Sequence, residues 1–267
     1  MNGQAHTAPR HRSTPSAAGV TTRAVANEFA KMRHLHVGLL IVVLALAVSA
    51  LTILTSVVSP DFADPATRRW EQLLAGLGLA VPLTAPLLLA ICASRVVDAE
   101  HQGNGWLLAQ TSGVTPGTLC RAKMLGLGIG VALATTAAVF VPLVVGYVLG
   151  IDQRLQWSAW LGQLACFVVV NLVVLAGHLM LAARVENQLV GLGIGVVGTI
   201  IAVFAPSLPP LVRHLTPWGY YSLAAAADHV DGALVAIEPA YGSIALLGLV
   251  GTVALVVITA RFDRQEA

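Results

Sequence analysis

The feature that most constrains this chain is a series of long apolar runs. A helix needs about 20 apolar residues to cross the hydrocarbon core of a bilayer. Six stretches reach or approach that length: His36–Val58, Leu73–Ser94, Leu125–Leu149, Ala159–Ala183, Leu189–Ala205 and Ser243–Ala260. A membrane β-barrel would alternate polar and apolar residues over about ten positions, whereas these runs are continuous. The sequence therefore predicts an all-α, polytopic membrane protein with six transmembrane helices.

The composition supports a bilayer as the main solvent of the surface. Of the 267 residues, 57% are hydrophobic and 10% are charged, whereas soluble domains carry about 25% charged residues. The formal net charge is +2 and like charges form no run, so we expect no nucleic-acid partner. Cys92, Cys120 and Cys166 have neither disulfide nor zinc spacing. We therefore expect buried reduced thiols and no metal site.

The basic residues predict the orientation of the chain in the membrane. Six spans place both termini on one side, together with the loop between the second and third spans. That side holds eleven Lys and Arg residues, and the other side holds four. Because cytoplasmic segments carry the excess of Lys and Arg, we expect both termini and this loop to be cytoplasmic.

The N-terminal region divides into a tail and a short helix. Residues 1–20 are rich in Pro, Ser, Ala and Arg and lack an apolar period, which predicts a disordered cytoplasmic tail before one six-span domain over 21–267. Val25, Phe29 and Met32 then recur at helical spacing, and the charged residues nearby are Glu28, Lys31 and Arg33. This pattern indicates an interfacial helix before the first span. A basic anchor without further role is the alternative.

The cytoplasmic loop from Ala99 to Lys123 is half polar, unlike most of the chain. We expect a first helix interrupted by glycines, and then a second helix with Thr115 as N-cap and Pro116 at its first position. The pair Glu100 and His101 has no third ligand or nucleophile within sequence reach. A metal or catalytic site is therefore disfavoured, and a docking surface for another protein fits the pattern better.

The apolar runs contain few polar residues that could serve a function. Asn171 and His178 lie seven positions apart and share one helix face. They could line a substrate path, but no clear span contains Asp or Glu, so a hydrogen bond to a neighbouring helix is the competing interpretation. The glycines in 191–198 match a dinucleotide fingerprint only formally, because they lie inside a span and not after a strand. We interpret them as sites of close helix packing.

The segment between the fifth and sixth spans is expected outside the cell. Its prolines break the helix, and its aromatic residues suit the membrane interface. Leu223–Ile237 is expected to be a short helix that dips towards the membrane without crossing it. The segment is interpreted either as an aromatic anchor or as an extracellular lid over a substrate path. The lid residues would be Pro217, Trp218, Tyr220 and Tyr221.

Two motifs resemble those of a known family. The stretch ANEFAKMRH resembles the entry helix that precedes the first span in permease subunits of type-2 ATP-binding-cassette (ABC) exporters. The pattern E-H-x-x-N-x-W-x-x-L, followed by a turn and A-K, resembles their cytoplasmic coupling region, with Glu100, Trp106 and Lys123 at matching positions. The resemblance covers residues 22 to 262. It is strongest to the short permeases of bacitracin- and lantibiotic-immunity transporters.

The resemblance implies a division of labour between chains. Such permeases hold no ATPase site and no cofactor. They pair with a second permease copy or a paralogue and dock two ABC ATPase subunits, which bind the ATP and Mg²⁺. Glu100–Ser112 would be the coupling helix, and the path would be lined mainly by the first, second and fifth spans. The coupling residues would be Glu100, His101, Asn104, Trp106, Leu107 and Lys123, framed by Glu28, Phe29, Lys31 and Arg33 of the interfacial helix.

The function predicted on this basis is that of a bacterial exporter permease surrounded by membrane lipid, and not an enzyme. It would move an amphipathic or peptide-like compound outward and protect the cell against an antibiotic, with ATP hydrolysed on the partner chain. A non-transporting sensor or assembly scaffold is one alternative. An intramembrane enzyme is a second, disfavoured because no catalytic or metal cluster lies at membrane depth.

Overall fold

The computed structural model of the protein describes residues 17–230 and 232–265. The first sixteen residues of the expected tail lie outside this range. The first helix, α1 (Ala17–His34), begins inside that expected tail, so residues 17–20 belong to the helix and the boundary at residue 20 is corrected.

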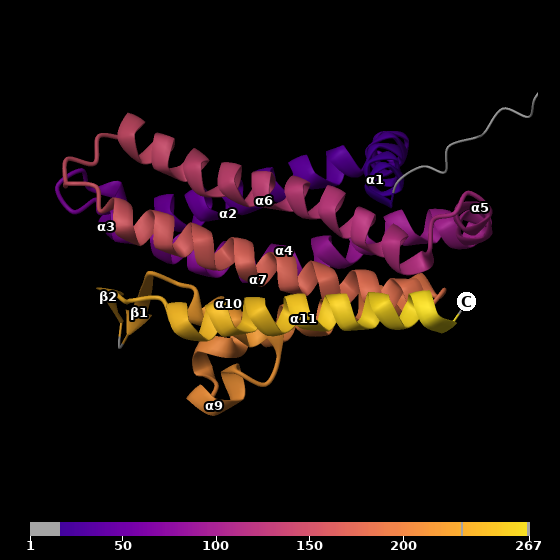
Figure 1. Ribbon diagram of the computed structural model, residues 1–267. Coiled ribbons are helices and arrows are strands. Elements are labelled where there is room, and N and C mark those ends of the chain that lie inside the picture. Colours follow the sequence, from indigo (N-terminus) through magenta and orange to yellow (C-terminus); the bar gives the residue numbers. More distant parts are fainter. Residues whose placement is uncertain (1–16, 231, 266–267) are drawn as a thin grey trace, which may run out of the picture.

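Six long helices run side by side along one axis (Figure 1). They are α2 (Val37–Val57), α4 (Trp70–Gln102), α6 (Pro116–Val148), α7 (Trp157–Arg184), α8 (Gln188–Phe204) and α11 (Tyr241–Gln265). Each is long and apolar enough to cross a membrane. This confirms the predicted all-α membrane fold and the order of its six spans.

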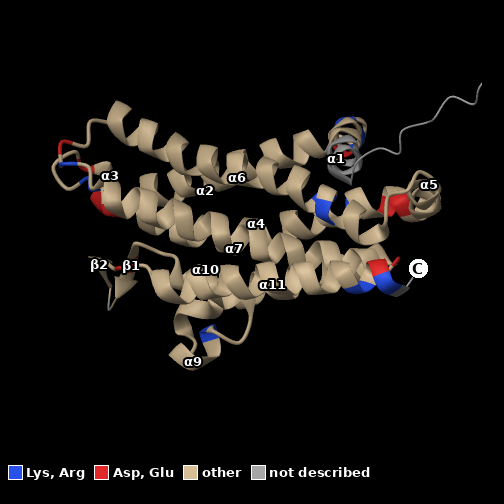
Figure 2. Ribbon diagram, in the orientation of Figure 1, with Lys and Arg blue, Asp and Glu red and all other residues tan. Residues whose placement is uncertain are grey.

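Two of these helices extend well beyond the apolar runs that predicted them. Both α4 and α6 contain 33 residues, a length of about 50 Å at 1.5 Å per residue, against a hydrocarbon core of about 30 Å. Their extra turns emerge at the end of the bundle that carries α1 and the C-terminus, here called the proximal end. Figure 2 shows charged residues gathered mainly at this end and at the opposite, distal end.

Shorter elements decorate the bundle. At the proximal end lies α5 (Gly105–Thr111), and α3 (Pro60–Ala63) lies at the distal end (Figure 1). The chain between the last two spans forms η1 (Ala205–Ser207), α9 (Pro210–Arg213), η2 (Pro217–Gly219), α10 (Tyr220–Leu223), β1 (Ala227–Val230) and β2 (Ala233–Ala236).

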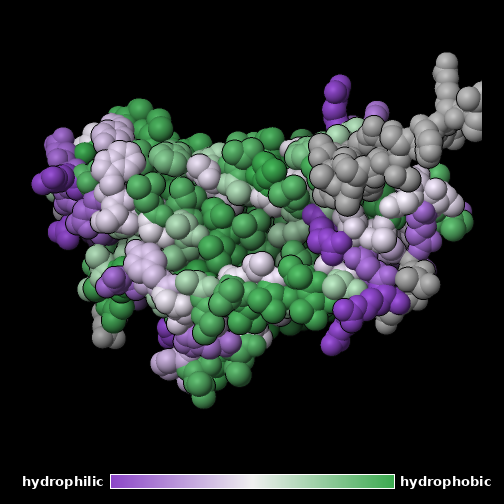
Figure 3. All heavy atoms as spheres, in the orientation of Figure 1, coloured by the Kyte–Doolittle hydropathy of each residue, from purple (hydrophilic) through white to green (hydrophobic). Residues whose placement is uncertain are grey.

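The core lies around α4 and α7. In their most apolar windows 56% of the residues are buried, whereas only 11% are buried in α11. On the face shown in Figure 3, the middle of the bundle is largely apolar, as expected where lipid replaces water. All three cysteines are free and buried, as predicted.

The prediction of a helix over Leu223–Ile237 is wrong for most of that stretch. Only its first residue is helical, and β1 and β2 pair as an antiparallel hairpin, with Ala227 opposite Ala236. The turn contains Gly232 at φ +79°, a conformation that two-residue hairpin turns require and that glycine adopts without strain. The Asp-Gly pair at 231–232 is a typical sequence signal of such a turn, so the sequence did contain a signal for the hairpin.

Candidate functional site

Four charged side chains from three helices meet at the proximal end. Lys123 Nζ of α6 lies 2.6 Å from Glu28 Oε2 of α1 and 2.7 Å from Glu100 Oε1 of α4. Lys31 Nζ lies 2.7 Å from the same Glu100 oxygen and 3.2 Å from Glu28 Oε1. These residues, here called the charge cluster, hold two negative and two positive charges and are therefore neutral as a unit.

Three of the four side chains in the charge cluster are buried. The side chains of Glu28, Glu100 and Lys123 are 1–2% exposed, and that of Lys31 is 44% exposed. Lys123 also donates a hydrogen bond to the Val96 carbonyl at 3.3 Å. Burial alone would lower the pKa of Lys31, but the hydrogen bond to Glu100 and the charge of Glu28 raise it above its ordinary value. Lys31 is therefore protonated throughout the physiological range.

Local geometry explains how α1 reaches the other two helices. Glu28 and Lys31 lie three residues apart and so share one face of α1. Met32 lies beside them, is buried, and packs on Gly126 of α6, where a Cβ would come within 2.6 Å of the Met32 methyl. Gly126 is one turn beyond Lys123. The same face of α6 thus supplies both the contact that admits α1 and the cation that binds it.

The junction between α4 and α5 adjoins the charge cluster. Instead of one coupling helix over Glu100–Ser112, the chain turns at Asn104, whose φ of +49° is left-handed, and α5 begins at Gly105. A Cβ at Gly105 would overlap the Glu100 carboxylate. The glycine is therefore required by the close approach of the start of α5 to the charge cluster.

The predicted coupling residues divide into a buried and a surface group. Glu100 and Lys123 are buried in the charge cluster, so in this structure a docked protein would not touch them directly. Asn104 and Leu107 are exposed, Leu107 at 61%. His101 and Trp106 are half-buried, with ring centroids 5.8 Å apart, and His101 Nε2 lies 3.1 Å from the Ala182 carbonyl oxygen. On the interfacial helix, Phe29 and Arg33 are exposed.

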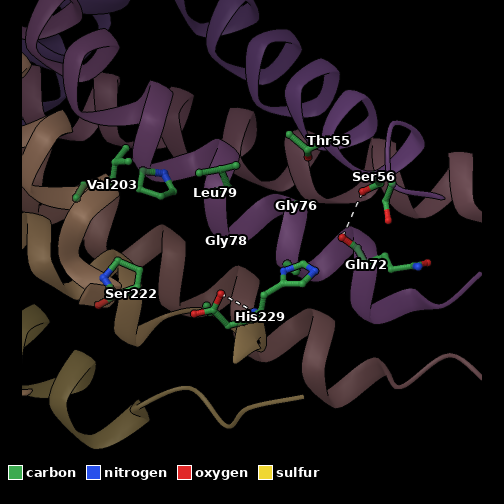
Figure 4. A pocket seen from close by; sticks show the side chains of 16 residues that line it. Thr55, Ser56, Gln72, Gly76, Gly78, Leu79, Val203, Ser222 and His229 are labelled. Carbon is green, nitrogen blue, oxygen red and sulfur yellow. Dashed lines mark hydrogen bonds between the residues drawn. The ribbon is translucent and has the colours of Figure 1, made fainter. Parts of the chain in front are cut away.

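A cavity of about 240 Å³ with both polar and apolar lining lies at the distal end (Figure 4). It is lined by α2, α4 and α8, which are the first, second and fifth spans, and by α10 and β1. Figure 4 shows Ser56 and Gln72 on one side of it and Ser222 and His229 on another. The molecule therefore has the charge cluster at one end and this cavity, here called the distal cavity, at the other. Helix α4 contributes residues to both.

A family model described as ABC-2 family transporter protein matches residues 24–202. This chain belongs to the ABC-2 transporter family. No match was found among curated proteins. ABC-2 proteins are the membrane components of ABC transporters and are not catalytic themselves, and membership implies association with ABC ATPase partners. The matched range contains all four residues of the charge cluster.

Asn171 and His178, the polar span residues singled out from the sequence of this ABC-2 permease, are buried among its helices. Asn171 donates a hydrogen bond to Thr135 Oγ1 at 2.9 Å and accepts one from Tyr221 Oη at 2.7 Å. His178 is buried, and its ring centroid lies 6.1 Å from that of Trp218. Neither Asn171 nor His178 lines the distal cavity. For Asn171, the hydrogen bond between helices describes its position better than the substrate path.

The aromatic segment of the permease folds back into the bundle. Tyr221 is fully buried and reaches Asn171, which is halfway along α7. Trp218 packs on Gly198 of α8, and Tyr220 is buried beside it. These aromatic side chains therefore pack against the helices of the bundle. Pro217 begins η2, which positions Trp218.

Sequence reasoning missed a second contact at the proximal end of the permease. Asp263, near the end of α11, accepts a hydrogen bond from the Gly117 N–H at 2.8 Å and lies 3.1 Å from Arg121. It thus places a negative charge at the N-terminus of α6, where free N–H groups and the helix dipole favour one. The signal was an acidic residue shortly after the last apolar run, which the sequence alone could not connect to α6.

Proposed function

We propose that this chain is the permease subunit of a bacterial ABC exporter, energised by ATP that two separate ATPase subunits hydrolyse with Mg²⁺. The observation that carries the proposal is the charge cluster, which ties α1, α4 and α6 together directly behind α5. The excess of basic residues on the proximal end supports a cytoplasmic position for it. That is the side on which ATP is available.

The surface around α5 suits a docked ATPase. Leu107 and Leu108 are 61% and 68% exposed at the proximal end, where no lipid tail would cover them. Beside them, a groove of about 370 Å³ is lined by His101, Trp106 and Glu186, among others. Trp106 Nε1 is buried without a partner in residues 17–230 and 232–265.

The charge cluster explains how force on α5 would reach the spans. A push on α5 moves Gly105 against the Glu100 carboxylate, because no space separates the two. Glu100 is bound to Lys31 and Lys123, so α1, α4 and α6 would move as one body. Sliding these helices apart would leave buried charges unpaired, which costs several kcal/mol.

The transport path is proposed to lie at an interface with a second permease, a copy of this chain or a paralogue. Support comes from apolar side chains of α9 and the loop after it, such as Leu211 and Leu215, which are 79% and 74% exposed. The compound moved outward is proposed to be amphipathic or peptide-like. Protection against an antibiotic of the bacitracin or lantibiotic type is the corresponding role.

The test is capture of the ATPase by the tagged permease, with Leu107→Asp as the probe variant. A charge at the centre of the exposed apolar pair should reduce capture at least about tenfold, a loss of about 1.4 kcal/mol. Val235→Asp is the matched control, because Val235 is 41% exposed on the distal hairpin. It should leave capture unchanged.

Two results would count against the proposal in different ways. Capture that is insensitive to Leu107→Asp would remove α5 from the docking surface. A permease that captures no ATPase at all, from membranes in which both are made, would favour a sensor or assembly scaffold.

A further inference from the structure

The distal cavity has the composition of a binding site for one part of a larger molecule. Its volume of about 240 Å³ is below the roughly 300–1,000 Å³ of typical small-molecule sites. Leu79, Pro82 and Val203 contribute apolar lining, and Ser56 and Ser222 contribute hydroxyl groups from different sides of the cavity. A ligand group that fits it must combine a polar head with a short apolar stem.

The charge of the cavity selects the kind of head. Asp228 is the carboxylate in its lining, and no Lys or Arg lines it. One Asp228 oxygen accepts the His229 N–H at 2.8 Å. Among the described residues, Asp228 forms no ion pair, unlike Glu28 and Glu100 at the other end. A half-buried carboxylate without a cation attracts one from outside.

The hairpin brings Asp228 to this position. Asp228 and His229 are on β1, and the preceding residues Ala225 and Ala227 pack over Gly78 of α4, at 3.5 and 3.7 Å from where a Cβ would stand. Figure 4 shows the His229 ring extending from the hairpin towards α4. Strand β1 of the hairpin therefore forms part of the cavity wall.

We propose that this cavity binds the ammonium group of a cationic amphipathic compound, with Asp228 as its counter-ion. The inference rests on the proposed function in that it places this binding step at the distal end of the export path. It narrows the cargo from any amphipathic compound to one with a protonated amine. The apolar stem would lie against Leu79 and Val203.

The test measures binding without any ATPase, in nanodiscs of phosphatidylcholine. The probe is a dodecylamine that carries a diazirine on its chain, and the matched neutral probe is the corresponding dodecanol. The amine should label residues 75–82 or 222–229 saturably upon irradiation, and the alcohol should not. Asp228→Asn should weaken saturable labelling about tenfold, or about 1.4 kcal/mol, and Asp228→Glu should retain it.

Two further variants keep the result interpretable. Glu238→Gln removes an exposed carboxylate just after the hairpin that does not line the cavity, and it should leave labelling unchanged. Gly78→Leu fills the space between α4 and the hairpin and should abolish labelling by the amine. Each variant must elute as the parent protein does before it is compared.

The outcomes separate this inference from the proposed function. Equal labelling by amine and alcohol, or labelling unaffected by Asp228→Asn, would overturn the ammonium site even if the ATPase docks as proposed. Specific labelling by the amine in a permease that captures no ATPase would leave the ammonium site standing and refute the exporter.

Discussion

Individual residues at the proximal end show how a small change could uncouple the helices. A Cβ at Gly105 would overlap the Glu100 carboxylate. We expect Gly105→Ala to displace Glu100 from Lys31 and Lys123 and to lower thermal stability in detergent by several degrees. Gly193→Ala is the control, because a Cβ at Gly193 meets nothing within 4 Å. An unchanged melting midpoint in Gly105→Ala would contradict the close approach.

The buried lysine should matter far more than its exposed counterpart. Lys123→Met leaves the buried carboxylates of Glu28 and Glu100 with the partly exposed Lys31 as their remaining cation. This should lower the free energy of unfolding by about 3–5 kcal/mol. Lys31→Met, at 44% exposure, should cost about 1 kcal/mol or less. Denaturant unfolding followed by intrinsic fluorescence compares the two. Equal losses would mean that burial does not set the strength of these pairs.

At this same scale, the resemblance placed the interfacial helix beside the coupling region, but neither it nor the sequence predicted which side chains pair. Glu28, Lys31, Glu100 and Lys123 were all singled out, but as members of two separate motifs. Lys123 and Glu28 are 95 positions apart, and no periodic pattern in the sequence relates such distant positions. The pairing depends on how α1 docks on α6, a tertiary event.

At the scale of elements, the sequence analysis predicted the six spans but missed the hairpin between the last two. A span is a local property, because about 20 apolar residues suffice to define it. The hairpin at Ala227–Ala236 was missed because its alanine-rich strands favour helix by composition, whereas its turn requires a positive φ at Gly232. The segment Ala205–Leu223 is expected outside the cell from its charge and prolines, which did not predict its contacts with α4, α7 and α8.

The contact between α11 and α6 is an element-scale device that can be tested. Asp263→Asn removes the charge at the N-terminus of α6 and the ion pair with Arg121. We expect faster hydrogen exchange at amides 117–119 and 259–264, because the end of α11 would detach more often. Glu186→Gln, which alters a carboxylate with 84% exposure, should leave exchange in both segments unchanged. Protection that survives Asp263→Asn would show that packing alone holds α11.

At the scale of the whole molecule, the orientation follows from the distribution of charge and is directly testable. Ser112 and Asp152 are exposed at the proximal and distal ends, and the native cysteines are buried. An impermeant maleimide applied to intact cells should label Asp152→Cys and not Ser112→Cys. Permeabilised cells should label both. The reverse pattern in intact cells would invert the assignment of the two ends.

The length of α4 has a consequence for the energetics of the whole molecule. This one helix carries Gly76 and Leu79 in the distal cavity and Glu100 in the charge cluster, about 32–36 Å apart along its axis. Pro82 and Pro86 remove two backbone donors between these points, so any bend in α4 would concentrate there. A ligand that favours one bend of α4 would alter ATPase affinity at the other end. Thermodynamic linkage then requires the ATPase to alter ligand affinity by the same factor.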